Sequence, residues 1–366
     1  MLYEKMDFKN FSLKKEEAEK NGKLLGFGLA FYVEGTGLGP YEGGHLKIHP
    51  ITGKIYANTG LTSQGQGHDT VFAQIISDQM GVSVEDVILT EGDSGSFDWG
   101  VATFASRAAV VSGNAIHKTA KVLRKKTIIA ASNMLEVDPS EIELRDGHAW
   151  VSNSNRSVSL AAVATATNPL RYAFNEAAKE ATQFAPSSKH DGPPLAEGQH
   201  PGLEATDYFS PPASTWAYGV HSVILEVDKL TCSVKILKYA LVHDCGNMIN
   251  PKIVEGQVMG GMAQGLAGAL YEKIEYDEDG SLMNANLVDF LVPYATEIPN
   301  IEMEHLETPS PINPLGVKGV GEAGTIPVAA TIASGLSDAC KNYENSDFYQ
   351  TPITPSMIFD VVSSKL

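Results

Sequence analysis

The chain has 366 residues, 43% of them hydrophobic, and its 27 Lys and Arg against 44 Asp and Glu give a formal net charge of −17. This length allows two or three compact domains with full cores. So acidic a balance argues against nucleic acid and anionic membrane surfaces as partners, because binding to either depends on clustered Lys and Arg. No apolar run is long enough to span a membrane and no signal peptide is recognisable, so a cytoplasmic location is expected.

The three cysteines, Cys232, Cys245 and Cys340, are far apart and form no C-x-x-C pair. This spacing indicates neither a disulfide framework nor a structural zinc site. Three thiols also cannot ligate an iron–sulfur cluster of the all-cysteine type. Any such cluster would therefore belong to another chain.

The first half of the chain alternates strand and helix patterns. Residues 1–22 are rich in Lys and Glu with helical spacing and predict an N-terminal helical segment. Strands are predicted at about 26–32, 46–48, 54–56 and 87–89. Helices are predicted after two polar loops, 63–70 and 100–107, the first helix ending at Gly81 and the second at about Leu135. The second helix carries a run of cations that indicates a solvated face more than an anion site: Lys118, Lys121, Arg124, Lys125 and Lys126.

The internal boundary is predicted within 183–214, which is rich in Pro, Gly, Ser and His and lacks hydrophobic periodicity. The expected domains are the helical segment 1–22, a first subdomain 23–185, a connecting segment 186–214 and a second subdomain 215–366.

The second half is predicted to open with a hairpin whose strands are Tyr218–Val227 and Ser233–Val242. A helix at about 252–272 and another opened by Pro327 should follow. The alternation of strands and helices gives an α+β (mixed α/β) fold class.

Four loops end at predicted helix N-termini, namely 63–70, 100–107, 244–251 and 316–324. Such ends present unpaired backbone N–H groups and the positive pole of the helix dipole, which favours an anion. Each loop alone is more often a turn that needs a positive φ. Four of them together suggest a shared anionic ligand.

Glu322 has small neighbours, Gly321 and Ala323-Gly324, so a ligand can approach it closely. It is a candidate general base, and the alternative is a glutamate that stabilises the following helix through the helix dipole. His68, in a polar loop, is either an exposed residue or a donor to a ligand oxygen.

Three other interpretations carry less weight. Gly319-Val-Gly-Glu-Ala-Gly324 matches G-x-G-x-x-G but lacks the strand, helix and acidic residue of a dinucleotide-binding Rossmann unit. A hydrolase built on His243 and Cys245 is disfavoured, because nearby residues of an extended segment need not face one another. The small residues of the 252–272 helix fit a close backbone neighbour as well as a cofactor.

Several motifs, in this order, resemble the molybdopterin-binding subunit of the molybdenum hydroxylases. They are Gln64-Gly-Gln-Gly-His68, Thr103-Phe-Ala-Ser-Arg107, Asp244-Cys-Gly-Asn-Met-Ile-Asn-Pro251, Gln257-Val-Met-Gly-Gly-Met-Ala-Gln-Gly265 and Gly319-Val-Gly-Glu322. This family comprises xanthine dehydrogenases, aldehyde oxidases and aerobic carbon monoxide dehydrogenases. The likeness spans roughly residues 22–340.

The resemblance implies two similar halves of an elongated cofactor-binding domain and a molybdenum-pyranopterin cofactor, in the form of molybdopterin cytosine dinucleotide. The metal would be held by the pterin dithiolene and by no protein ligand, and Glu322 would be the catalytic base. The residues implied to bind the cofactor are Gln64, Gly65, Gln66, Gly67, His68, Thr70, Thr103, Phe104, Ala105, Ser106, Arg107, Asp244, Asn247, Gln257, Lys318, Gly319 and Gly321.

The chain is short for this family, so a second polypeptide is expected to supply the N-terminal half of the subunit. Iron–sulfur (2Fe-2S) and FAD subunits are the expected electron acceptors. The small-molecule substrate would carry an electron-poor carbon, as in an N-heteroaromatic such as nicotinate, a purine or an aldehyde. The alternatives are carbon monoxide oxidation, a truncated or degenerate fragment, and a non-catalytic cofactor-carrier or assembly module.

Overall fold

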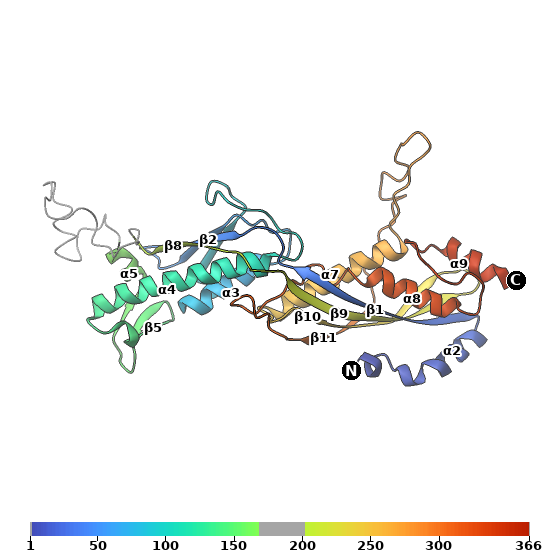
Figure 1. Ribbon diagram of the computed structural model, residues 1–366, viewed down its shortest axis with the longest axis horizontal. Coiled ribbons are helices and arrows are strands. Elements are labelled where there is room, and N and C mark those ends of the chain that lie inside the picture. Colours follow the sequence, from blue (N-terminus) through green and yellow to red (C-terminus); the bar gives the residue numbers. More distant parts are fainter. Residues whose placement is uncertain (1, 168–201, 366) are drawn as a thin grey trace. The chain divides into compact units, whose positions relative to one another are not determined.

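The computed structural model describes residues 2–167 and 202–365, which divide into two compact units (Figure 1). Unit 1 comprises residues 1–36, 215–310 and 316–366, and unit 2 comprises 37–214 and 311–315. Each unit contains a four-stranded sheet in which one edge pair is parallel and the other pairs are antiparallel. This mixture of helices and sheets confirms the expected α+β class.

The sheet of unit 1 has the order β1-β9-β10-β11. Its strands are β1 (Lys23–Thr36), β9 (Thr215–Asp228), β10 (Val234–Asp244) and β11 (Ile301–Leu306). β9 and β10 form the predicted hairpin, and Asp228 fixes the turn by accepting hydrogen bonds from the amides of Leu230 and Thr231. β1 pairs with β9 along its whole length, although the two strands are far apart in sequence.

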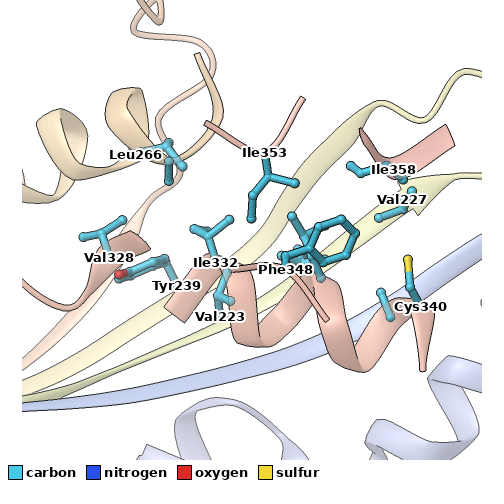
Figure 2. Packing of buried hydrophobic residues seen from close by; sticks show 14 of the residues in the cluster. Val223, Val227, Tyr239, Leu266, Val328, Ile332, Cys340, Phe348, Ile353 and Ile358 are labelled. Atoms are coloured by element: carbon cyan, nitrogen blue, oxygen red, sulfur yellow. The ribbon is translucent and has the colours of Figure 1, made fainter. Parts of the chain in front are cut away.

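Helices cover both faces of this sheet because its strands bury alternate residues on opposite sides. The helices α7 (Pro251–Leu270), α8 (Val328–Cys340) and α9 (Pro355–Val362) bury one face, where Val223, Tyr239 and Ile332 pack together (Figure 2). The helices α1 (Leu2–Lys5) and α2 (Phe11–Lys20) accompany the other face, where Phe11 packs with Leu25 and Ile224.

The sheet of unit 2 has the order β4-β3-β2-β8. Its strands are β2 (Glu42–Ile48), β3 (Ile55–Thr59), β4 (Val87–Glu91) and β8 (Glu204–Phe209). β3 and β4 are parallel, and the helix α3 (His68–Met80) lies between them in sequence. Gly81 ends α3 with a left-handed φ of 63°, as predicted.

The long helix α4 (Asn114–Leu135) packs against β2 and β8, and a short π-helical turn, Ala109–Gly113, leads into it (Figure 1). Its buried side chains recur every three or four residues, which explains why periodicity revealed it. A small second sheet contains β5 (Ile142–Arg145), β6 (His148–Val151) and β7 (Ser157–Ser159), and the helix α5 (Leu160–Ala166) follows.

The units depart from the expected subdomains 23–185 and 215–366 at one element. Residues 23–36 form β1 and belong to the sheet of unit 1, because their hydrogen-bonding partner is β9. Most of the expected connecting segment, 186–214, lies outside the described residues, and its end forms β8. Among the helices of the described ranges, none has the length and apolar character to cross a membrane.

Candidate functional site

In unit 2, the loop before α3 carries the motif Gln64–His68. Gly67 adopts a left-handed φ of 72° and starts the helix at His68 without a side-chain cap. Gln64 and Gln66 bond to each other, since the Gln66 amide nitrogen donates to the Gln64 side-chain oxygen over 3.2 Å. Gly65 has a φ of 101° and open space where a side chain would be. The loop is therefore held in one shape while it faces open space, beside the amides of a helix N-terminus.

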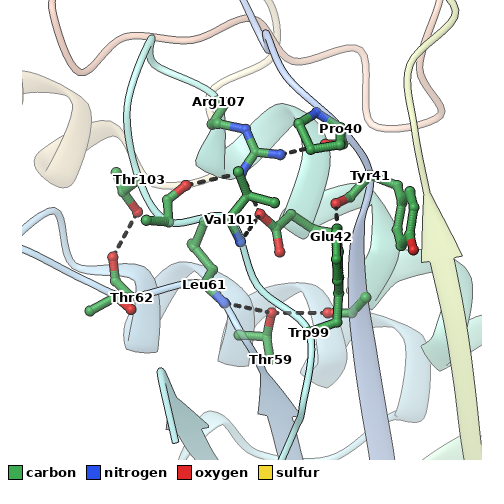
Figure 3. Close-up of polar contacts among 12 residues, drawn as sticks. Pro40, Tyr41, Glu42, Thr59, Leu61, Thr62, Trp99, Val101, Thr103 and Arg107 are labelled. Atoms are coloured by element: carbon green, nitrogen blue, oxygen red, sulfur yellow. Dashed lines mark hydrogen bonds and ion pairs between the residues drawn. The ribbon is translucent and has the colours of Figure 1, made fainter. Parts of the chain in front are cut away.

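The second loop, residues 99–107, packs directly on the first (Figure 3). A Cβ on Gly60 would lie 1.8 Å from the Trp99 carbonyl oxygen, and a Cβ on Gly100 would lie 2.0 Å from the Gly60 oxygen. Only glycine allows this approach. The Thr103 hydroxyl also donates to the Thr62 carbonyl over 2.7 Å. The loop that carries Thr103–Arg107 is thus packed on, and hydrogen-bonded to, the segment directly before Gln64.

The side chain of Arg107 holds this second loop in place. Its guanidinium is fully buried, pairs with Glu42 on β2 and donates to the Pro40 carbonyl (Figure 3). It also donates to the carbonyls of Leu38 and Ala102. Four of its five N–H donors are thereby used within the chain. The backbone above it is folded into left-handed conformations at Ala102, Ala105 and Ser106. The side chain of Arg107 therefore shapes the loop, whereas Phe104 is half exposed on it.

His68 is buried, so the first of its two interpretations, an exposed loop residue, is wrong, and the second, a donor to a ligand oxygen, stays a prediction. Its ring stacks on Phe72 with centroids 5.4 Å apart, and its Nδ1 lies 3.8 Å from Oε1 of Glu91 at the end of β4. Burial lowers the pKa of His68 to about 4. Burial, together with the charge of Asp69, raises the pKa of Glu91 to about 7. Thr70, by contrast, is exposed, with its amide bonded to Asp69.

In unit 1, the buried carboxylate of Asp244 at the end of β10 collects donors from four segments. Oδ1 accepts from the Gly246 amide and pairs with Nζ of Lys318, each over 2.9 Å. Oδ2 accepts from the Tyr218 hydroxyl and the Thr308 amide, each over 3.0 Å. Burial alone would raise the pKa of Asp244, yet these hydrogen bonds hold it below its usual value.

The loop 316–319 is attached to this cluster through its backbone. The Asn247 amide donates to the Gly316 carbonyl over 3.1 Å, and the Lys318 amide donates to the Cys245 carbonyl over 2.7 Å. The Gly319 amide donates to the hydroxyl of Thr36, the last residue of β1, over 2.8 Å. Lys318, besides pairing with Asp244, lies over the Tyr218 ring. The loop is consequently fixed to β1 and β10 before the chain reaches Glu322.

Glu322 lies in the exposed turn between this loop and α8, next to Gly321. Its carbonyl accepts from the amides of Thr325 and Ile326, which curls the chain toward the helix. The turn packs on α7: a Cβ on Gly324 would lie 2.2 Å from the Val258 carbonyl oxygen, and one on Gly261 would lie 3.0 Å from Cα of Gly324. A close backbone neighbour thus accounts for Gly261, while Gly260 and Gly268 have no such contact. Gln257 lies on α7, partly buried.

The hydrolase interpretation finds no support in this arrangement. His243 bonds through Nε2 to Nδ1 of His305 over 2.7 Å, on the face of the sheet that Tyr239 and Leu241 share. Burial, reinforced by Asp244, raises the pKa of the Cys245 thiol to about 12. Such a thiol is not a nucleophile at neutral pH. Among the described residues, no group of three His, Cys, Asp or Glu side chains could hold a metal ion.

Sequence reasoning singled out the loops but missed the residues that hold them. Glu42, Tyr218 and Glu91 sit singly in strands, with no motif around them. Their partners lie in other elements of the fold. A lone acidic residue in an apolar strand, as at Glu42, is the only local signal that could have drawn attention.

Comparison with known proteins shows what this arrangement resembles. Residues 1–299 match the model of a molybdopterin cofactor-binding domain. The chain is 35% identical over 98% of its length to the nicotine 6-hydroxylase large subunit of Paenarthrobacter nicotinovorans, covering 42% of that protein. It is 33% identical over 89% of its length to the carbon monoxide dehydrogenase large chain of Afipia carboxidovorans, covering 39% of that chain.

A comparison with solved structures gives the same family. The quinoline 2-oxidoreductase of Pseudomonas putida 86 superposes with a TM-score of 0.83 and 33% identity over 99% of this chain and 45% of that one. The chain thus spans about two fifths of the length of these relatives.

Proposed function

Since this chain belongs to the molybdopterin-binding family of the molybdenum hydroxylases, we propose that it is the C-terminal half of the cofactor-binding subunit of a multi-subunit hydroxylase. The substrate is a small molecule with an electron-poor carbon, such as an N-heteroaromatic or an aldehyde, and the oxygen comes from water. The names of two relatives, a nicotine hydroxylase and a quinoline oxidoreductase, favour the N-heteroaromatic class.

The loops of unit 2 suit the anionic part of a molybdenum-pyranopterin dinucleotide. The Gln64–His68 loop presents amides at the N-terminus of α3, and Gly65 leaves open space that any side chain would fill. Thr103 and Arg107 fix the neighbouring loop in strained, left-handed conformations that persist only where the surroundings hold them. We assign the Gln64–Thr70 and Thr103–Ser106 segments to direct cofactor contact and Arg107 to holding the loop.

In unit 1 we assign the reactive end of the cofactor to the turn that carries Glu322. When bound, the cofactor would supply the two-electron oxidation and would acidify a water-derived oxygen. Glu322 would hold the proton lost from that oxygen on its carboxylate. A carboxylate is a weak base for bulk water, so Glu322 needs a proton donor that the bound cofactor would make more acidic.

The cluster around Asp244 gives Glu322 its position. One side of the turn is fixed by the Lys318 ammonium and by the backbone hydrogen bonds at Gly316, Lys318 and Gly319. The other side is fixed by the packing of Gly324 on α7. Asn247 and Gln257 flank this region on the loop after β10 and on α7. The observation that carries the proposal is an exposed carboxylate on a turn anchored at both ends, because preorganised placement is what a general base requires.

The partners are proposed from the family. The chain covers about two fifths of its relatives, and we propose that the remaining part of such a subunit completes the cofactor site. Separate iron–sulfur and FAD subunits accept the electrons. All three cysteines of this chain are buried and unpaired, so none of them is arranged to ligate a cluster.

The test is to purify the chain with its natural partners and to compare Glu322→Gln with the wild-type complex. Glutamine keeps the shape of the side chain but cannot take the proton. Turnover of an N-heteroaromatic substrate should fall by about 10²–10⁴ while molybdenum and pterin contents stay unchanged. The matched control is Glu344→Gln, an exposed glutamate after α8, which should leave turnover unaltered.

Two outcomes would contradict the proposal. A wild-type complex without molybdenum and pterin would mean that the chain is a non-catalytic assembly module. Full turnover of Glu322→Gln would mean that another group is the base.

A further inference from the structure

The pair formed by His68 and Glu91 in unit 2 is unusual because a buried polar atom of each side chain faces the other and neither of these two atoms is satisfied. The exposed fractions of the two side chains are 7% and 14%, and the facing atoms, His68 Nδ1 and Glu91 Oε1, are 3.8 Å apart. Neither atom has a hydrogen-bond partner among residues 2–167 and 202–365. A buried polar atom left unpaired is destabilising, so two of them facing each other indicate a hydrogen bond that forms between them in the working protein.

The chemistry of the two groups limits how that bond can form. If Glu91 is protonated, it donates to Nδ1 of His68, and the proton of the neutral imidazole must then be on Nε2. If Glu91 is ionised, it accepts from Nδ1, and Nε2 is left with a lone pair. Nδ1 is the ring nitrogen sealed in the interior, whereas Nε2 is not among the sealed atoms. The state of Glu91 therefore decides whether His68 presents a donor or an acceptor outward.

At and below neutral pH, the surroundings of the pair favour a protonated Glu91, and therefore a proton on Nε2 of His68. Burial and the Asp69 carboxylate raise the pKa of Glu91 to about 7, opposed only in part by a hydrogen bond from the backbone of Ser63. Burial lowers the pKa of His68 to about 4 against the opposing effect of Asp69. Both groups are thus neutral near pH 6. Asp69, on the first turn of α3, is the neighbouring charge that acts on both.

We propose that Glu91 is a positioning residue for the cofactor loop, which as a neutral carboxylic acid donates to Nδ1 of His68 and so presents the Nε2–H of His68 to a phosphate oxygen of the bound dinucleotide. This rests on the proposed function of the Gln64–His68 loop. The stacking of His68 on Phe72 fixes the plane of the ring, and Glu91 sets its tautomer. A phosphate oxygen accepts hydrogen bonds and has no proton to offer a lone pair at neutral pH, so the other tautomer weakens its binding.

A pH dependence follows from this arrangement. As the pH rises through about 7, Glu91 ionises, the proton of His68 moves to Nδ1, and the outward nitrogen loses its donor. The release of the cofactor should then accelerate by about tenfold between pH 6 and pH 8.5, the effect of one hydrogen bond to a charged group.

The experiment measures the rate at which the purified holo-complex loses molybdenum and pterin on dilution into buffers from pH 6 to pH 9. The wild type should show the rise with a midpoint near 7. Glu91→Gln, which donates at every pH, should release the cofactor slowly throughout. Asp69→Asn should move the midpoint to lower pH, a shift that a merely structural role for Glu91 would not produce.

Glu143→Gln, an exposed glutamate on β5, is the matched control and should keep the wild-type profile. Glu91→Leu should release the cofactor about tenfold faster than wild type at pH 6, and its thermal unfolding is measured to separate this effect from misfolding. If the wild-type complex holds cofactor but Glu91→Gln keeps the wild-type pH profile, this inference fails. If the wild-type complex holds no pterin at any pH, the proposed function itself fails.

Discussion

Each unit contains one buried ion pair that fixes the loops of the candidate site, but the two pairs are built in opposite ways. In unit 1 the carboxylate is the centre of the hydrogen-bond network: Asp244 accepts four hydrogen bonds, and Lys318 is one of its donors. In unit 2 the cation is the centre: Arg107 donates to three carbonyls as well as to Glu42, whose Oε2 has no hydrogen-bond partner in the described part of the chain. The stability of each loop should therefore depend more on the central residue than on its partner.

Arg107→Leu should have the largest effect. It leaves Glu42 as an uncompensated buried charge and deprives the carbonyls of Leu38, Pro40 and Ala102 of their donor. Breaking a buried pair costs about 3–5 kcal/mol. Urea unfolding would measure this loss of stability, and hydrogen exchange at the amides of α3 and β2 would locate it. Glu42→Gln should cost less, because glutamine can still accept from the guanidinium, and an equal loss in the two variants would refute the central role of Arg107.

Asp244→Asn tests the corresponding centre in unit 1. The amide keeps the volume and one acceptor but places an NH₂ group against donors, so about 2–3 kcal/mol of stability should be lost. Hydrogen exchange at the amides of Gly246, Thr308 and Gly319 should speed up in this variant. Lys318→Met should perturb fewer of these amides, because three donors to Asp244 remain. Equal perturbation by both would show that the pair acts as a single unit.

Two buried histidines of unit 1, His221 and His243, are not part of an ion pair among the described residues, and their contribution to stability depends on pH. His221 and His243 are buried, and burial lowers their pKa values to about 3 and about 4. Because the folded state disfavours the charged form, stability is complete above pH 6.5 and falls as the pH drops toward 4. At pH 5 each histidine should cost about 2 kcal/mol relative to pH 7. In His243→Gln the acid-induced loss, measured by urea unfolding at pH 7 and pH 5, should shrink by about 2 kcal/mol.

The sequence predicted those parts of the molecule that depend on local patterns. The β9–β10 hairpin followed from alternation around a turn, and α7 followed from Asn250-Pro251, where the Asn250 side chain caps the Ile253 amide. Gly81 and Pro327 marked helix ends for reasons of backbone geometry alone. The family was also predicted from motifs, and the comparisons confirm it.

What the sequence did not predict depends on contacts between distant segments. β1 was assigned to the first subdomain because its neighbours in sequence are there, yet its partner, β9, begins at Thr215. Arg107 belonged to a recognised motif, but its burial depends on Glu42 and on carbonyls of the preceding loop. Residue type and spacing contain no information on such partners, so a cofactor contact and a structural role could not be separated in advance.

The smallest effects should come from the glycines of α7, which differ in what lies beside them. A Cβ on Gly261 would lie 3.0 Å from Cα of Gly324, a backbone atom that cannot turn aside, whereas one on Gly260 would meet nothing within 4 Å. Gly261→Ala should therefore cost about 1 kcal/mol by displacing the Glu322 turn. Gly260→Ala, its neighbour, should gain about 0.5–1 kcal/mol through helix propensity.

The two substitutions add the same methyl group one residue apart, so helix propensity cancels between them and the difference reports the contact with the turn. Thermal unfolding gives the stability of each variant. Turnover of the complex gives the position of Glu322, because a base displaced even slightly from its proton loses rate. If Gly261→Ala lowers stability but leaves turnover intact, α7 supports the fold without setting the place of the carboxylate, and the anchoring of the Glu322 turn then comes from the Asp244 side alone.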